Sequence, residues 1–87
     1  MFNINGGCVT VAYVLISTEI GAEASVLEIL RSMSEVEEGY IIYGIYDIIA
    51  KLNVENEEKL KEVVTSIRRI EGVKSTLTIL VLRGFKK

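Results

Sequence analysis

The sequence predicts an α+β domain in which a four-stranded antiparallel sheet carries two helices on one of its faces. Strand-like and helix-like stretches follow one another in the order strand, helix, strand, strand, helix, strand. The chain has 87 residues, 49% of them hydrophobic, which is enough for one domain with a core and too short for two. It contains no proline, so Gly, Asn, Ser and Asp must make the turns.

The first part of the chain has the pattern of a strand, a helix and a second strand. Residues 8–17 are β-branched and aromatic, and they are apolar almost without interruption after Thr10, which is typical of a strand buried on both faces. A break at residues 18–21 precedes a predicted helix over residues 21–33, and residues 36–43 form the second predicted strand. The apolar stripe of the helix comprises Ala22, Val26, Ile29, Leu30 and Met33.

The middle of the chain has the pattern of a hairpin. A tight connection at Gly44 and Ile45 joins the second strand to a third strand over residues 46–54. Strands that are joined so closely must be antiparallel. The residues of the third strand that share one face are Ile48, Ala50 and Leu52.

The last part of the chain has the pattern of a helix followed by a strand. Asn56 is a suitable N-cap, and acidic residues follow it in the first turn, where the helix dipole favours them. The helix is predicted to end near Arg69, before Gly72, and the last strand covers residues 73–82. The apolar stripe of this helix comprises Leu60, Val63, Val64, Ile67 and Ile70.

The order of the elements defines the predicted topology. Each half of the chain is a βαβ unit, and right-handed crossovers place both helices on the same side of one sheet. This is the ferredoxin-like βαββαβ arrangement, in which we expect the first and last strands to lie side by side in the centre of the sheet. The domain is expected to span residues 8–83, after a flexible leader of residues 1–7 and before a tail of residues 84–87.

The face of the sheet away from the helices is also predicted to be apolar. Both alternating sets of side chains in the first strand are largely apolar, and the second and last strands repeat this pattern. The set that the helices do not cover forms a patch larger than a monomer usually exposes. We therefore expect the chain to dimerise sheet-on-sheet about a two-fold axis. The alternative is a monomer whose open face is covered by another protein.

The charge of the chain excludes several classes of function. The formal net charge is −2, with ten basic and twelve acidic residues mixed along the sequence, so there is no electrostatic footprint for nucleic acid. The one basic cluster, Arg83, Lys86 and Lys87, is typical of a solvated terminus. No targeting leader and no apolar run of about 18 residues is present, which predicts a cytoplasmic protein without a membrane segment.

The sequence offers little for catalysis or for metal binding. Histidine is absent, which excludes Ser–His and Cys–His nucleophile pairs and a structural zinc site built from Cys and His. Cys8 is the single cysteine, so no disulfide forms within the chain, and a plain structural cysteine is favoured over a nucleophile there. We expect no enzyme activity, no metal and no cofactor.

Two short motifs remain as candidate binding residues. The first is residues 43–47 (YGIYD), where Gly44 permits a close approach of a ligand and Asp47 is unusual for a strand. The alternative for this motif is ordinary turn chemistry. The second motif is Thr76 and Thr78, which share one face of the last strand and either bind a polar ligand or simply suit a strand.

These motifs resemble the effector-binding (RAM) domain of the Lrp/AsnC family, the leucine-responsive or feast/famine regulators. The resemblance runs from Tyr13 to Leu82. It rests on residues 18–23 (TEIGAE), 43–48 (YGIYDI), 70–73 (IEGV) and 75–78 (STLT). Members of this family usually carry an N-terminal helix-turn-helix, whereas only a short leader precedes the first strand here. The resemblance therefore implies a stand-alone form that does not bind DNA itself.

The resemblance also implies a ligand and a set of site residues. In the family, domains dimerise through their sheets, dimers assemble into rings, and amino acids or related small metabolites bind between dimers. Transferred residue by residue, the implied ligand-binding residues are Gly44, Tyr46, Asp47, Thr76 and Thr78. Asp47 would accept from an α-ammonium group, and backbone N–H groups around Gly44 would hold an α-carboxylate. The threonine hydroxyls would complete a polar shell suited to a zwitterion.

The sequence therefore supports two functions. In the first, the chain binds an amino acid and oligomerises, and so takes part in the regulation of transcription or of amino-acid metabolism. In the second, it is a ligand-free interaction protein that uses the same sheet surface to co-assemble with full-length Lrp/AsnC regulators. Ile45 is apolar where many relatives have a polar residue, which would narrow the range of ligands or indicate that only the oligomer is retained.

Overall fold

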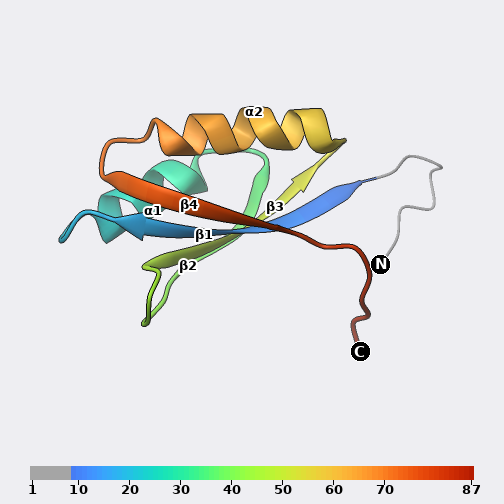
Figure 1. Ribbon diagram of the computed structural model, residues 1–87, viewed down its shortest axis with the longest axis horizontal. Helices are drawn as coiled ribbons and strands as arrows, with labels where there is room; N and C mark the ends of the chain where they lie inside the picture. The colour runs from blue at the N-terminus through green and yellow to red at the C-terminus, as the bar shows by residue number, and fades with distance from the viewer. Residues whose placement is uncertain (1–8) are drawn as a thin grey trace.

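The computed structural model describes residues 9–87, which form one sheet and two helices. The elements are β1 (Thr10–Thr18), α1 (Glu23–Arg31), β2 (Val36–Ile41), β3 (Ile48–Val54), α2 (Glu57–Arg68) and β4 (Val73–Leu80). Both helices lie on the same side of the sheet (Figure 1). This two-layer βαββαβ arrangement confirms the ferredoxin-like prediction. The expected leader, residues 1–7, and Cys8 lie outside the described residues.

The strands of the sheet follow the order β2-β3-β1-β4, and each neighbouring pair is antiparallel. β1 and β4 lie side by side as predicted, but the prediction that they share the centre of the sheet is wrong. The central strands are β1 and β3, and β4 is an edge strand. The reason is that each helix carries the chain over one intervening strand, so that β3 returns between β2 and β1.

The hydrophobic core lies between the sheet and the helices. Alternate side chains of β1 and β3 point toward the helices and are buried, which confirms the face predicted for the third strand. The residues of α2 predicted to form its stripe are buried or pack against the core. The largest fully buried side chains are Ile16, Leu30, Ile48, Leu52 and Ile67.

The buried side of α1 differs from its predicted stripe. Ile29 is 44% exposed, whereas Leu27 packs against the core. The Cδ1 atom of Leu27 lies 3.2 Å from the position that a Cβ would take on Gly39 of β2. A glycine in this strand therefore leaves the room into which Leu27 packs, and α1 is oriented toward the edge strand rather than toward the centre of the sheet.

The connection between β2 and β3 is longer than the predicted tight turn. β2 ends at Ile41 and β3 begins at Ile48, so residues 42–47 form a loop. The N–H of Ile42 donates to the carbonyl oxygen of Asp47 at 2.9 Å and closes this loop. Asp47 thus lies just before a strand and not inside one, which removes the conflict with the low strand propensity of aspartate.

Two local signals in the second half of the chain act as predicted. Asn56 is the N-cap of α2, and its Oδ1 atom accepts a hydrogen bond from the N–H of Lys59 at 2.8 Å. Gly72 ends the turn after α2 with φ +101°, and a Cβ there would lie 2.8 Å from the Cβ of Ala22. Glycine at this position therefore lets the turn before β4 pack against the start of α1.

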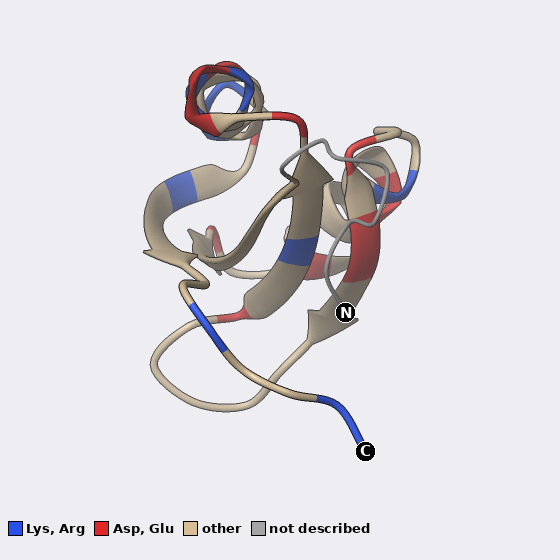
Figure 2. Ribbon diagram, turned by 90° about the vertical axis from the view of Figure 1, so that its right-hand side faces the viewer, with Lys and Arg blue, Asp and Glu red and all other residues tan. Residues whose placement is uncertain are grey.

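Charged residues are concentrated on the helices and on the outer strand β2, while the other strands consist mostly of uncharged residues (Figure 2). Within residues 9–87, neither helix has the length and apolar character needed to cross a bilayer. Over that same range, no three or more His, Cys, Asp or Glu side chains come together in a way that would hold a metal ion.

Candidate functional site

Three connections meet at one end of the sheet and bring the predicted hairpin motif to that end. They are the β1–α1 turn, the β2–β3 loop and the α2–β4 turn, all at the left in Figure 1. The N–H of Thr18 donates to Oδ2 of Asp47 at 2.8 Å. The N–H of Glu19 donates to the carbonyl oxygen of Gly72 at 2.7 Å. The end of β1 and the turn that follows it are thereby bonded to both of the other connections.

Asp47 fixes the β2–β3 loop with its backbone and its side chain together. Its N–H donates to the carbonyl oxygen of Ile16 at 2.9 Å, and its carboxylate accepts from Thr18. Both partners belong to the last part of β1, which is remote from Asp47 in the sequence. One carboxylate oxygen therefore has a structural role, and the position of the side chain is set before any ligand binds.

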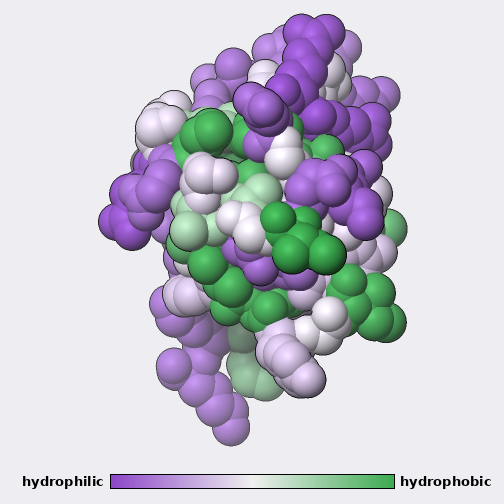
Figure 3. All heavy atoms as spheres, turned by 90° about the vertical axis from the view of Figure 1, so that its left-hand side faces the viewer, coloured by the Kyte–Doolittle hydropathy of each residue, from purple (hydrophilic) through white to green (hydrophobic). Residues whose placement is uncertain are grey.

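The tip of the β2–β3 loop is exposed and largely apolar. Gly44 has φ +149°, and no described atom lies within 4 Å of the position of a Cβ there. Tyr43 and Ile45 are almost fully exposed, as is Ile20 of the β1–α1 turn, while Tyr46 is half-buried. Figure 3 shows that apolar side chains gather on this end of the molecule. The backbone around Gly44 is thus accessible to a ligand or to another protein.

Thr76 and Thr78 lie on the side of β4 that faces the helices. They are paired with Ile16 and Val14 of β1, and Thr78 is exposed while Thr76 is half-buried. The hydroxyl of Thr76 accepts a hydrogen bond from Nε of Arg68, in the last turn of α2, at 3.1 Å. Local sequence patterns do not predict this contact, because it depends on how α2 packs across the sheet.

The five predicted ligand residues form two groups that a single chain does not bring together. Gly44, Tyr46 and Asp47 belong to the loop that precedes β3, whereas the two threonines lie on β4, with β1 in between. Neighbouring strands are about 4.8 Å apart, so about 10 Å separates β3 from β4. The central strand β1 therefore separates the two groups of predicted ligand residues.

Two shallow hollows lie away from both groups. One has a volume of about 220 Å³ and lies between α1 and β2, with Leu27, Val36 and Gly39 among its lining residues. The other has a volume of about 390 Å³ and includes Asn53 and Lys59 in its lining. Neither hollow is lined by a predicted ligand residue.

The face of the sheet opposite the helices is open and mostly apolar, in agreement with the sequence. The register of the strands gives its rows across β4, β1, β3 and β2. These rows are Leu77, Leu15, Ile49 and Tyr40, and then Ile79, Tyr13, Lys51 and Glu38. Leu77, Ile79 and Tyr40 are 45%, 47% and 55% exposed. The charged residues of these rows lie together, on β3 and β2.

Comparison with known proteins identifies a family. The family model described as the Lrp/AsnC ligand binding domain matches residues 11–87. The HTH-type transcriptional regulator FL11 of Pyrococcus furiosus is 33% identical over 76 residues, which are 87% of this chain and 50% of the regulator. The crystal structure of FFRP-DM1 has a TM-score of 0.81 and 34% identity, and the match covers 84% of this chain and 99% of that one.

An enzyme also contains a related segment. A homocitrate synthase of Saccharolobus islandicus is 40% identical over 57 residues, which are 66% of this chain but 12% of the enzyme. The chain spans about half the length of the FL11 regulators that it matches. The shared part is the ligand-binding domain, and the resemblance drawn from the hairpin and threonine motifs is confirmed.

Proposed function

The chain belongs to the Lrp/AsnC family through its ligand-binding domain, and from this premise we propose that it binds a small effector and oligomerises in the regulation of transcription or of amino-acid metabolism. The observation that carries the proposal is the match of residues 11–87 to that domain. The relatives named as transcriptional regulators support the regulatory role. The proposed effector is an amino acid or a related small metabolite.

The ligand is proposed to bind at the β2–β3 loop as a zwitterion. Oδ2 of Asp47 is held by the N–H of Thr18, so the other carboxylate oxygen is positioned to accept from an α-ammonium group. Backbone N–H groups beside Gly44 would hold the α-carboxylate, because both charges of a desolvated zwitterion need partners. Tyr46, half-buried in the same loop, would pack against the ligand.

The threonine group is proposed to reach the ligand from a second subunit. Within one chain, β1 separates Thr76 and Thr78 from the β2–β3 loop, and a contact between subunits would remove that separation. The apolar side chains exposed around the loop support such a contact, because apolar clusters of this kind mark interaction sites. These side chains are Ile20, Tyr43 and Ile45.

A second copy of the chain is proposed to cover the open face of the sheet. Packing two such faces against each other would bury the apolar rows of both copies about a two-fold axis. The net charge of −2, with acidic and basic residues mixed along the chain, supports the proposal that this domain does not itself contact DNA. We place its action in the cytoplasm, together with the regulators that it resembles.

Thermal unfolding against each of the twenty amino acids, at millimolar concentration, tests the proposal. A ligand present at about 100 times its Kd stabilises a protein by about 2.7 kcal/mol, which raises the Tm of a small domain by several degrees. A shift confined to one amino acid or to a few related ones is expected. The absence of any shift would contradict an amino-acid effector.

Asp47→Asn is the sharpest variant for the site. It removes the negative charge but keeps an oxygen that accepts from the N–H of Thr18, so the unliganded fold should persist. The ligand-induced shift is expected to disappear, because the α-ammonium group loses its ion pair. Thr76→Val should weaken the shift, and Thr65→Val, on the exposed surface of α2, is the matched control that should retain it. A ligand-induced Tm shift of wild-type size in Asp47→Asn would show that the ligand binds elsewhere.

The alternative is a ligand-free role in which the chain co-assembles with full-length Lrp/AsnC regulators through the open face. This alternative predicts mixed oligomers with a helix-turn-helix relative, which native mass spectrometry detects. Wild type and Asp47→Asn would form these oligomers equally, and no amino acid would shift the Tm.

The match to part of a homocitrate synthase favours one further candidate, in which the domain makes an enzyme respond to an effector. The chain itself is proposed to have no catalytic activity in this role. Adding the purified chain to a homocitrate synthase from the organism that encodes the chain tests this candidate. A change in enzyme activity that depends on an added amino acid would support it, and unchanged activity would exclude it.

A further inference from the structure

Among the strand-paired residues that the structure describes, Lys51 of β3 is the one cation on the open face of the sheet. Its side chain is 29% exposed, and its cross-strand neighbours are Tyr13 of β1 and Glu38 of β2. The side chains that the strand-paired residues of β1 and β4 place on this face carry no charge, and Lys74 is the unpaired residue at the register shift between these two strands. The paired residues include Tyr13, Leu15, Ser17, Ser75, Leu77 and Ile79. Lys51 therefore interrupts a surface that is otherwise suited to burial.

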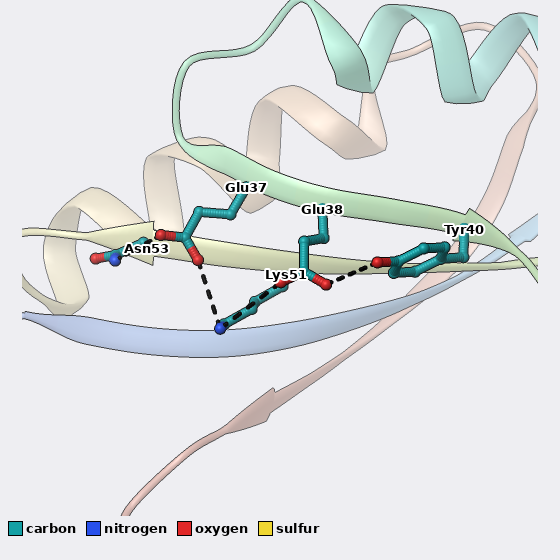
Figure 4. Close-up of polar contacts among 5 residues, drawn as sticks. All are labelled: Glu37, Glu38, Tyr40, Lys51 and Asn53. Carbon is teal, nitrogen blue, oxygen red and sulfur yellow. Dashed lines mark hydrogen bonds and ion pairs between the residues drawn. The ribbon is translucent and has the colours of Figure 1, made fainter. Parts of the chain in front are cut away.

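Lys51 is neutralised from within its own chain (Figure 4). Its Nζ atom lies 3.5 Å from Oε1 of Glu37 and 3.9 Å from Oε2 of Glu38. Oε2 of Glu37 accepts from Nδ2 of Asn53 at 3.0 Å, and Oε1 of Glu38 accepts from the hydroxyl of Tyr40 at 2.9 Å. Every oxygen of the two carboxylates thus has a partner in this network.

A β-bulge places both carboxylates on the same face. In a regular strand, consecutive side chains point to opposite faces, so only one of Glu37 and Glu38 would reach Lys51. The register between β2 and β3 shifts between Val36 and Glu38, and this irregularity turns both glutamates toward the lysine. The paired carboxylates are therefore a built feature of the edge strand.

We propose that Glu37, Glu38 and Lys51 control self-association: a second copy of this chain covers the open face, and it binds tightly only while both carboxylates neutralise the lysine. This inference rests on the homodimer proposed above. The charges favour a copy of the same chain as the occupant. Because the network is satisfied internally, the covering surface need not supply a charge, and the uncharged paired residues of β1 and β4 in a second copy meet that condition.

When a second copy covers Lys51, Glu37 and Glu38, the contribution of their ion pairs to stability changes. On an exposed surface such pairs contribute little to stability. When a partner excludes water from Lys51, an ammonium group without a counter-charge becomes strongly unfavourable. Glu37 and Glu38 lie on the edge strand with side chains 43% and 47% exposed, so they pair with the lysine while they keep part of their own hydration at the rim.

The test is the dimer dissociation constant of the full chain, measured by sedimentation equilibrium. The double variant Glu37→Gln/Glu38→Gln removes both charges and keeps oxygens that accept from Asn53 and Tyr40. Its Kd is expected to rise about tenfold or more, because Lys51 alone loses its partners. Adding Lys51→Met removes the unpaired cation and should bring the Kd back close to that of wild type.

The matched control is Glu28→Gln/Glu62→Gln, which removes two paired carboxylates from the helices and should leave the Kd unchanged. A wild-type Kd in the first double variant, or an equal loss in this control, would overturn the inference and leave the homodimer standing. A wild-type chain that stays monomeric would overturn both. If the first double variant does not fold, Glu37→Gln alone is measured, and a wild-type Kd again overturns the inference.

Discussion

The two faces of the sheet are built from the same strands and differ in how completely one chain covers them. On the helix side, Ile16 and Ile48 of the central strands are fully buried. On the open side, Leu15 is only half-buried, and Leu77 and Ile79 are nearly half exposed. The comparison shows that the strands are apolar on both faces of the sheet, whereas the chain has only one layer of helices to cover them. The helix side is complete within one chain, and the open side is the face that we propose a second copy covers.

Ile16→Ala is expected to have the largest effect on the stability of the single chain. The side chain is fully buried under the helices, so its truncation should lower the free energy of unfolding by about 2–5 kcal/mol. Leu15→Ala, on the opposite face, should cost much less at concentrations where the chain is monomeric. Urea unfolding followed by circular dichroism measures both losses. Equal losses would contradict the difference between the faces.

Thr18→Val is expected to change the free energy of unfolding by a smaller amount and to raise it. Thr18 is 6% exposed, and its Oγ1 atom has no hydrogen-bond partner within residues 9–87. Valine keeps the shape and removes a hydroxyl that is costly to bury, so the free energy of unfolding should rise by about 1 kcal/mol. Ser17→Ala, its neighbour on the open face, is the control and should give no comparable gain. A loss of stability in Thr18→Val would show that the hydroxyl is bonded in solution.

Glu38→Gln is expected to have the smallest effect, on the titration of Tyr40. The hydrogen bond from the phenol to Glu38, and then the negative charge of that carboxylate, raise the pKa of Tyr40 above its ordinary value of 10.0. A raised folded-state pKa means that the stabilising contribution is complete below the ordinary pKa and is lost as the pH rises through the raised one. Glu38→Gln should therefore move the midpoint back toward the ordinary value.

The titration of Tyr40 is measured by NMR of the tyrosine rings. Glu37→Gln, which leaves the hydrogen bond of Tyr40 in place, is the control and should change the midpoint less. The same midpoint in wild type and Glu38→Gln would show that the phenol and the carboxylate are not bonded in solution.

The covered face is the part of the fold that the sequence predicts best. The alternation of Ile48, Ala50 and Leu52 and the stripe that includes Val63 and Ile67 both match the buried residues. The physical reason is that a strand or helix with one covered side must repeat its apolar residues at its own period. The order of the elements then restricts the topology to very few arrangements.

The β2–β3 loop is predicted less well, because its geometry depends on residues far away in the chain. Apolar and aromatic residues continue through positions 42 and 43, so the local pattern does not mark the end of the strand. The loop is set by the bonds of Asp47 to Ile16 and Thr18. The choice of Leu27 over Ile29 as a core residue has a similar origin, since it depends on the space above Gly39.

The candidate site likewise combines features that the local sequence predicts with features that depend on long-range contacts. The sequence indicates Gly44, Asp47 and the threonines by residue type and resemblance, and the structure puts them in two groups on either side of β1. The contact of Arg68 with Thr76 joins α2 to β4 and has no local signature. Distances between such groups follow from strand order, which the sequence pattern defined only in part.

The sequence by itself determined the order of the elements, the two apolar faces of the sheet and membership of the Lrp/AsnC family. The tertiary structure decided that β4 is an edge, that Asp47 bonds the end of β1, and that Glu37 and Glu38 both reach Lys51. The reason is that periodicity depends on neighbouring residues, whereas strand order, the β-bulge and a hydrogen bond across 29 positions depend on long-range pairing.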